Sequence, residues 1–179
     1  HLNGEIGVGD SVDGGRIAVV GPASAAPGGE RVDLGDCALM PGLVNTHHHL
    51  YQTLTRAVPA AQNADLFHWL VTLYPIWANL TPEALRISTL TGLAELALSG
   101  CTTVCDHLYM FPNGCRLDDE IEAAREIGMR FHASRGSMSL GESQGGLPPD
   151  GVVEEEAFIL QDSRRLIEQY HDPTPGALT

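Results

Sequence analysis

The residues whose types and spacing are best suited to chemistry are three consecutive histidines that follow the short apolar run "PGLVNT". Imidazole nitrogens are common ligands of zinc and iron. Successive side chains of a β-strand point to opposite faces, so His47 and His49 would share one face while His48 points away. The spacing therefore predicts that His47 and His49 bind one metal ion at the end of a strand.

Two other interpretations of the histidine cluster have to be weighed. An expression tag does not fit, because the cluster is short, internal and preceded by a well-formed apolar strand. A surface or hydrogen-bonded triplet remains open, since two histidines separated by one residue form a weak pattern by themselves. For His48 we expect packing or hydrogen bonding and no metal contact.

Apolar strands alternate with helices from residue 41 onwards, and this alternation is typical of parallel βα units. The firmest local signal is the helix 82–99, since Thr81 can cap its first turn, Pro82 suits its first position and Gly100 ends it. The segment 50–80 contains prolines and interspersed aromatic residues, and is expected to be a long functional loop. The other expected elements are strands over 43–49, 101–107 and 129–136 and helices over 117–128 and 152–171.

Residues 1–40 differ in composition from the rest of the chain, because they are rich in glycine and contain short runs typical of β-strands. The runs "GRIAVVG" and "ERVDLGDCALM" are expected to be strands of a small sheet, separated by the turn-forming stretch "PASAAPGG". The stretch "GEIGVGDSVDGG" does not sit between a strand and a helix, and it is interpreted as turns and not as a phosphate-binding loop. A domain boundary is expected near Pro41.

The composition of the chain limits the kinds of molecule that we expect it to bind. The formal net charge is −13, from 10 basic and 23 acidic side chains, and no Lys/Arg cluster is present, so we expect no nucleic-acid partner. No apolar run approaches the roughly 20 residues of a membrane span, and no signal-peptide pattern is seen, so we expect no membrane association and a cytoplasmic location. The four cysteines form no CxxC pair and are expected to be buried free thiols.

Three stretches together carry a resemblance to a known family: "MPGLVNTHHHLYQT", "SGCTTVCDHLYMFP" and "GMRFHASRGSMSLGESQGG". They resemble the amidohydrolase superfamily, in the branch that contains 8-oxoguanine deaminases, guanine deaminases and s-triazine hydrolases. The resemblance covers residues 15–179 and implies an α/β fold with a partial (β/α)₈ TIM-type barrel. Residues 41–179 would be about the first three βα units of this metal-dependent barrel, and residues 1–40 would be part of a small β-sandwich domain.

The resemblance also implies an activity. His47 and His49 would bind one zinc ion, with iron as the alternative, and the metal would lower the pKa of bound water so that hydroxide attacks an aromatic amidine carbon. The preferred reaction is deamination of 8-oxoguanine, a purine-type heterocycle, to urate plus ammonia. An s-triazine hydrolase that removes chloride or an alkylamine is the alternative. A non-catalytic member of the fold is a third interpretation, and the presence of both histidines argues against it.

Four residues near strand ends or in the segment 50–80 are candidates for holding a flat polar ring: Gln52, Trp77, Tyr109 and Arg135. For Trp77 the alternative is a packing anchor, and for Arg135 it is an ion pair with an acid. Asp106 and His107 could support the site or cap a turn. The family's general acid/base and remaining metal ligands are expected beyond residue 179, so the catalytic residues are unknown, and we expect an N-terminal portion of a longer, homo-oligomeric protein.

Overall fold

A computed structural model describes residues 5–8, 17–21, 30 and 32–173, and its chain divides into two compact units, His1–Met40 and Pro41–Thr179. The second unit is the larger one and contains the three histidines. None of the helices in the described part of the chain is long and apolar enough to cross a membrane.

In the first unit, the described residues form a two-stranded antiparallel sheet of β1 (Glu5–Val8) and β2 (Ile17–Gly21). The expected strand in "GRIAVVG" is therefore present, but the interpretation of "GEIGVGDSVDGG" as turns throughout is wrong, because β1 lies within it. Pairing with β2 supplies the backbone hydrogen bonds that offset the low strand propensity of glycine.

The second expected strand of this unit, "ERVDLGDCALM", is also wrong, since residues 30 and 32–40 form no strand. A tight turn interrupts it, in which the Gly35 N–H donates to Asp33 Oδ1 at 2.8 Å. Side chains of aspartate often compete with strand pairing in this way. All four cysteines are free thiols as expected, but Cys37 is exposed and Cys105 is half-buried, so the expectation that all four are buried is wrong.

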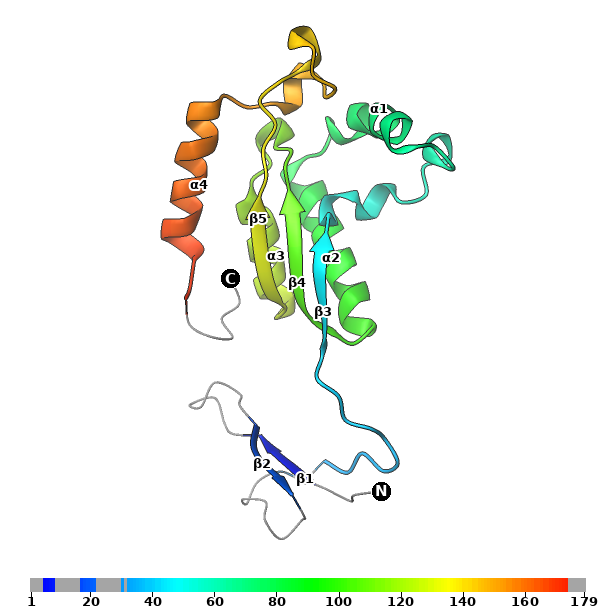
Figure 1. The fold of residues 1–179 in the computed structure, drawn as a ribbon, viewed down its shortest axis with the longest axis vertical. Coiled ribbons are helices and arrows are strands. Elements are labelled where there is room, and N and C mark those ends of the chain that lie inside the picture. Colours follow the sequence, from blue (N-terminus) through cyan, green and yellow to red (C-terminus); the bar gives the residue numbers. More distant parts are fainter. Residues whose placement is uncertain (1–4, 9–16, 22–29, 31, 174–179) are drawn as a thin grey trace. The chain divides into compact units, whose positions relative to one another are not determined.

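The second unit is built on a parallel sheet in the order β3-β4-β5, which confirms the predicted βα arrangement. The strands are β3 (Leu43–His48), β4 (Cys101–Leu108) and β5 (Arg130–Arg135). Helices α2 (Pro82–Leu98) and α3 (Leu117–Ile127) lie together on one face of this sheet (Figure 1). As expected, Thr81 caps α2, and its hydroxyl accepts from the Ala84 N–H at 3.2 Å.

The core of this unit is formed by apolar side chains from the sheet and from the helices that cover it. Val104 and Leu108 of β4 belong to the same buried cluster as Leu85 and Leu93 of α2. Gly92 of α2 allows close packing at the end of β3, because a Cβ atom there would lie 2.6 Å from Leu50 Cδ2. This contact sets the position of the chain segment that directly follows the histidines.

The segment 50–80, expected to be a loop, contains the helix α1 (Leu66–Trp77) and two 3₁₀ helices, Leu50–Thr55 and Pro59–Ala61, so the loop prediction is wrong there. Asp65 caps α1 by accepting from the His68 N–H at 3.0 Å. Pro75 lies in the last turn of α1, where the loss of one backbone hydrogen bond does not prevent the helix from reaching its end.

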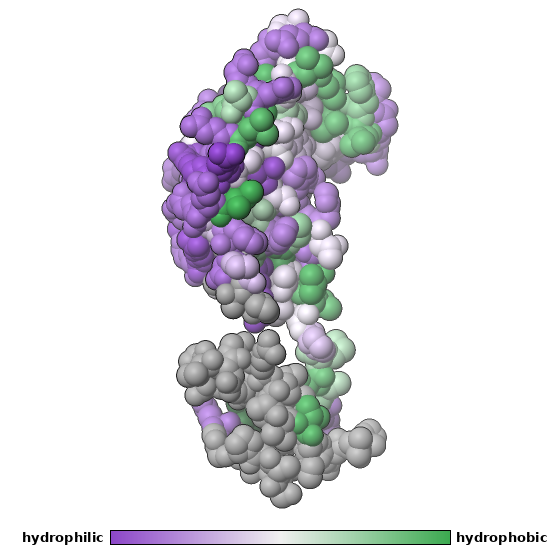
Figure 2. Space-filling view, turned by 60° about the vertical axis from the view of Figure 1, so that its left-hand side comes forward, coloured by the Kyte–Doolittle hydropathy of each residue, from purple (hydrophilic) through white to green (hydrophobic). Residues whose placement is uncertain are grey.

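Much of the apolar surface of α1 faces solvent, as the apolar patch at the upper right of Figure 2 shows. Leu66 and Phe67, at the start of the helix, are 72% and 59% exposed. Its opposite side is packed, since Leu73, Tyr74 and Trp77 are buried. The segment is thus an apolar helix that packs through one side, where Trp77 contacts the 3₁₀ helix Leu50–Thr55, and exposes apolar side chains on the other.

Helix α4 (Glu156–Tyr170) is attached to α3 by polar contacts. The Arg165 guanidinium donates to both carboxylate oxygens of Asp118 at 2.8 and 2.7 Å, and the Tyr170 hydroxyl donates to the same group at 2.8 Å. Burial alone would raise the pKa of Asp118, but these hydrogen bonds and one from Arg116 hold it well below its usual range. Asp118 therefore stays ionised and keeps the two helices together.

Replacing Gly128 by alanine tests the turn between α3 and β5. Gly128 ends α3 with φ of +76°, a left-handed conformation that costs other residues about 1 kcal/mol. We expect Gly128→Ala to lower the free energy of unfolding by about that amount, measured by urea denaturation of the full-length protein. Gly151→Ala is the matched control, because nothing lies within 4 Å of an added Cβ there and no positive φ is required. Equal stability of the two variants would contradict the turn assignment.

Candidate functional site

The site is organised by the end of β3, where His47 and His49 lie side by side. Their ring centroids are 4.8 Å apart and the ring planes are nearly perpendicular. His48 pairs in register with Asp106, which is fully buried, so the His48 side chain points towards the helix-covered face of the sheet. The alternation inferred from the sequence thus places two imidazoles on one face and the third on the other.

One hydrogen bond determines which nitrogen of His49 can bind a ligand. His49 Nδ1 lies 2.7 Å from the carbonyl oxygen of His107, and a carbonyl can only accept, so Nδ1 carries the proton. Burial lowers the pKa of His49, an effect that the bond to His107 opposes and the neighbouring His47 adds to. A neutral imidazole with a lone pair on Nε2 is the form that a metal ion requires.

An aromatic cluster surrounds His49. The rings of His107 and Tyr109 have centroids 5.4 Å from the His49 centroid, and the ring of Tyr51 lies 6.0 Å away. Burial raises the pKa of the Tyr51 hydroxyl far above its ordinary value, so this group stays neutral and accepts a hydrogen bond from Gln52 Nε2 at 3.0 Å. The structure therefore brings Gln52 and Tyr109, two of the predicted contact residues, next to the histidine pair.

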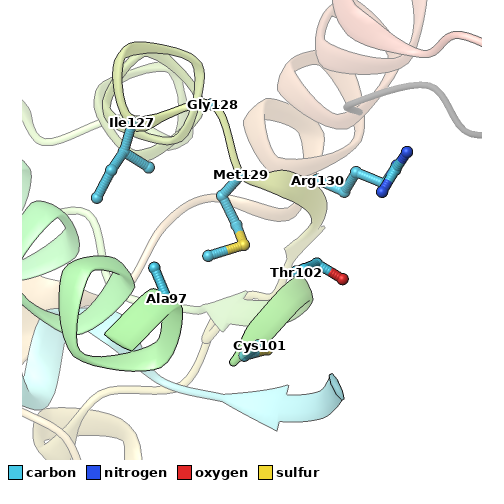
Figure 3. A pocket seen from close by; sticks show the side chains of 7 residues that line it. All are labelled: Ala97, Cys101, Thr102, Ile127, Gly128, Met129 and Arg130. Atoms are coloured by element: carbon cyan, nitrogen blue, oxygen red, sulfur yellow. The ribbon is translucent and has the colours of Figure 1, made fainter. Parts of the chain in front are cut away.

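A cavity of about 240 Å³ opens beside this cluster, lined by His48, His49, Gln52, Thr53 and Arg56. A larger hollow of about 460 Å³ lies elsewhere, at the starting ends of β4 and β5, where Met129 and Cys101 line it (Figure 3). In parallel α/β folds ligands bind at the carboxyl ends of the strands, and the histidines occupy that end. The smaller cavity lies at that end of the sheet, and it reaches the histidine pair through His49 and Gln52.

Trp77 takes a supporting position. Its side chain has no exposed surface, its Nε1–H donates to Thr55 Oγ1 at 3.0 Å, and its ring packs against Tyr51 at a centroid distance of 5.2 Å. It therefore fixes the 3₁₀ helix that follows the histidines. Trp77 is therefore placed as a packing anchor, and this placement does not favour direct contact between Trp77 and a substrate.

Arg135 is directed away from the histidine pair. Its side chain is 5% exposed, and it donates to Glu154 at 2.8 Å and to Asp162 at 3.3 Å while its guanidinium lies 4.4 Å from the Phe111 ring centroid. The register explains the direction, because Arg135 pairs with Leu108, a buried residue of the helix-covered face. Its position at a strand end suggested substrate contact, but the structure shows the ion-pair alternative.

Two buried acids complete the support of the site. Asp106 accepts from the Leu50 N–H at 2.6 Å, and burial raises the pKa of Asp106 to about 6. Glu120, in the first turn of α3, is fully buried, and sequence reasoning missed it, because its neighbours Asp118 and Asp119 make the same acidic signal at a helix start.

The residues present fit a metal ion in part. His47 and His49 can offer two nitrogens from one face, and the described residues contain no cluster of three or more His, Cys, Asp or Glu side chains that could hold a metal. Catalytic zinc usually has three protein ligands and one open position. The pair can therefore supply part of such a ligand set.

Comparisons with known proteins agree with this geometry. The chain is 52% identical to the 8-oxoguanine deaminase of Pseudomonas aeruginosa over 171 residues, which are 93% of this chain and 38% of that protein. It is 35% identical to the hydroxydechloroatrazine ethylaminohydrolase of Pseudomonas sp. strain ADP, covering 84% of this chain and 32% of that one. The chain thus spans well under half the length of these relatives.

Among solved structures, the atrazine chlorohydrolase of Arthrobacter aurescens complexed with zinc superposes with a TM-score of 0.70 at 34% identity. The match covers 88% of this chain and 37% of that one. The model of the amidohydrolase family matches residues 38–177, which include β3, β4, β5 and the histidine pair. The chain belongs to the amidohydrolase family.

Proposed function

We propose that the protein containing this chain is a metal-dependent hydrolase that deaminates 8-oxoguanine to urate and ammonia. The observation that carries the proposal is the histidine pair at the end of β3, in a chain 52% identical to an 8-oxoguanine deaminase. The parallel order β3-β4-β5 supports the finer proposal that residues 41–179 are about the first three units of a (β/α)₈ barrel. The proposal also keeps residues 1–40 as part of a β-sandwich.

His47 and His49 would hold one zinc ion per active site, with iron as the alternative. Bound there, the metal would supply activation of a water molecule for attack on the ring. The chain's own residues prepare this site, since the His107 carbonyl keeps the His49 proton on Nδ1 and the buried Tyr51 excludes water beneath the pair. The general acid/base is not assigned to any described residue.

Gln52 and Tyr109 are the residues we propose to contact the heterocycle. The Gln52 amide can hydrogen-bond a ring nitrogen or carbonyl, and the partly exposed Tyr109 ring can meet the edge or face of a purine. Trp77 and Arg135 act through their neighbours in this proposal: Trp77 holds Thr55, and Arg135 holds Glu154 after β5.

A second candidate is an s-triazine hydrolase that removes chloride or an alkylamine. It is favoured by the 35% identity to the ethylaminohydrolase and by the TM-score of 0.70 to the atrazine chlorohydrolase. Addition of water to an electron-poor ring carbon would serve either leaving group. The proposal further includes a cytoplasmic homo-oligomer that acts on a small heterocycle.

Ammonia release by the full-length, zinc-loaded protein distinguishes the two candidates. We expect turnover of 8-oxoguanine to exceed that of guanine, isoguanine, and chloro- and amino-s-triazines, and we expect chelator treatment to abolish it until zinc is restored. Turnover of a triazine with inert purines would establish the second candidate instead.

Single alanine variants test the metal ligands. Loss of an outer partner of a metal ligand costs about 10- to 100-fold in affinity, so His47→Ala and His49→Ala should each lower zinc affinity by more than about 100-fold, measured by chelator competition. The control is His48→Ala, which removes an imidazole from the opposite face and should leave the affinity nearly unchanged. Equal losses in all three variants would show that the alternation along β3 does not select the ligands.

The contact by Gln52 is tested by Gln52→Ala. Losing one hydrogen bond to the substrate should lower kcat/KM about 10-fold, through KM more than kcat, with zinc content unchanged. Gln62→Ala is the matched control, because Gln62 is exposed and its amide bonds only weakly to Val58 O at 3.5 Å. An unchanged kcat/KM in Gln52→Ala would remove this residue from the proposed substrate site.

A further inference from the structure

Two buried carboxyl groups lie behind the histidine pair. Asp106, in the middle strand β4, and Glu120, in α3, have no exposed surface. They lie on either side of the same contact, since Asp106 accepts from the Leu50 N–H, the Leu50 carbonyl accepts from Ser88, and the adjacent Thr89 contacts Glu120. Within the described residues, no N–H or O–H group donates to Asp106 Oδ2 or to Glu120 Oε2. The two carboxyl groups can therefore bond to each other if one of them keeps its proton.

The surroundings decide which group holds that proton. Asp106 Oδ1 accepts from the Leu50 N–H at 2.6 Å, and this strong bond favours the ionised form of Asp106. Glu120 has only a weak contact with the Thr89 hydroxyl at 3.4 Å. Burial and the charge of Asp106 raise the pKa of Glu120 well above its ordinary value. The neutral member of the pair is accordingly Glu120.

The bond from Asp106 reaches the backbone that carries the histidines. Leu50 directly follows His49, and its peptide groups are fixed on both sides: Asp106 accepts from its N–H, and its carbonyl accepts from Ser88 Oγ at 2.7 Å. Leu50 has no exposed surface. A shift of Asp106 would therefore move the residue next to His49 and weaken the bond between His49 and the His107 carbonyl.

We propose that Glu120 is a positioning residue that donates its carboxyl proton to Asp106 and so holds the Leu50 amide in place behind the histidine pair. The effect on zinc binding rests on the proposed function, whereas the shared proton and the fixed amide do not. Without the donor, a buried carboxylate would face an apolar or vacant site, which is unfavourable.

Two substitutions of Glu120 distinguish the loss of its hydrogen-bond donor from the loss of its side-chain volume. Glu120→Gln keeps an N–H donor opposite Asp106, and Glu120→Leu keeps a similar volume without one. Ile121→Ala is the matched control, because Ile121 is the next residue of α3 and is 2% exposed, so this variant loses core packing without touching the pair. All are made in the full-length protein.

Three measurements are made on each variant and on the unchanged protein at neutral pH: hydrogen exchange of the Leu50 amide, zinc affinity by chelator competition, and the infrared band of a protonated carboxylic acid. We expect Glu120→Leu to accelerate the Leu50 exchange and to lower zinc affinity about 10-fold, while Glu120→Gln and Ile121→Ala keep both near the original values. The infrared band should be present in the unchanged protein and absent in both Glu120 variants.

Several results would overturn the proposal. Absence of the acid band from the unchanged protein would show that no proton is shared, even if Glu120→Leu fails to fold. Equal effects of Glu120→Gln and Glu120→Leu would deny the donor role, and slow Leu50 exchange in Glu120→Leu would deny the positioning role. Failure of the proposed function looks different: the band and the exchange pattern persist, but the protein binds no zinc or deaminates no heterocycle.

Discussion

The pairing of β3 with β4 is the constraint on which the rest of the site depends. Placing His48 opposite Asp106 directs His47 and His49 to the other face and brings the His107 carbonyl to His49 Nδ1. A shift of one residue along β4 would exchange the two faces and put the imidazoles among the helices. The same register brings the Asp106 carboxylate to the Leu50 N–H, so ligand orientation and backbone position are set together.

The degree of burial distinguishes the side chains that can contact a substrate from the side chains that support the site. Asp106, Glu120 and the side chain of Arg135 are held by partners inside the unit, and their charges or protons are used within the fold. Side chains that are buried in this way cannot move to contact a ligand without breaking their own hydrogen bonds or ion pairs. Gln52, which lines the cavity, and Tyr109, whose ring lies beside His49, keep some exposure and retain that freedom.

Local signals predicted those parts of the structure that local interactions determine. The helix α2 follows from the cap at Thr81 and from Pro82, and the direction of the three histidines follows from alternation along one strand. Helix α1 was not predicted, because a proline such as Pro75 indicates an interrupted helix in the sequence. In the structure Pro75 lies in the last turn of α1, where the helix tolerates it.

The direction of Arg135 depends on its register with Leu108, and no pattern within β5 reveals that register. Glu120 is likewise indistinguishable in sequence from the half-buried Asp118 and Asp119, and only packing against β4 separates them. Pairing between distant segments thus determines which acids and bases support the site, whereas spacing along one strand suffices to identify the two histidines.

In the proposed barrel, the exposed side of β3 would connect the site to the remaining strands. β3 is an edge strand of the described sheet, and its apolar side chains Leu43 and Val44 are 54% and 61% exposed. An apolar strand with a free edge is unfavourable in water, and a closed barrel removes such edges by adding a neighbouring strand. That neighbour would lie beside the histidine pair as well, so the closure that covers Leu43 and Val44 would also bring further ligands to the ion that His47 and His49 are proposed to hold.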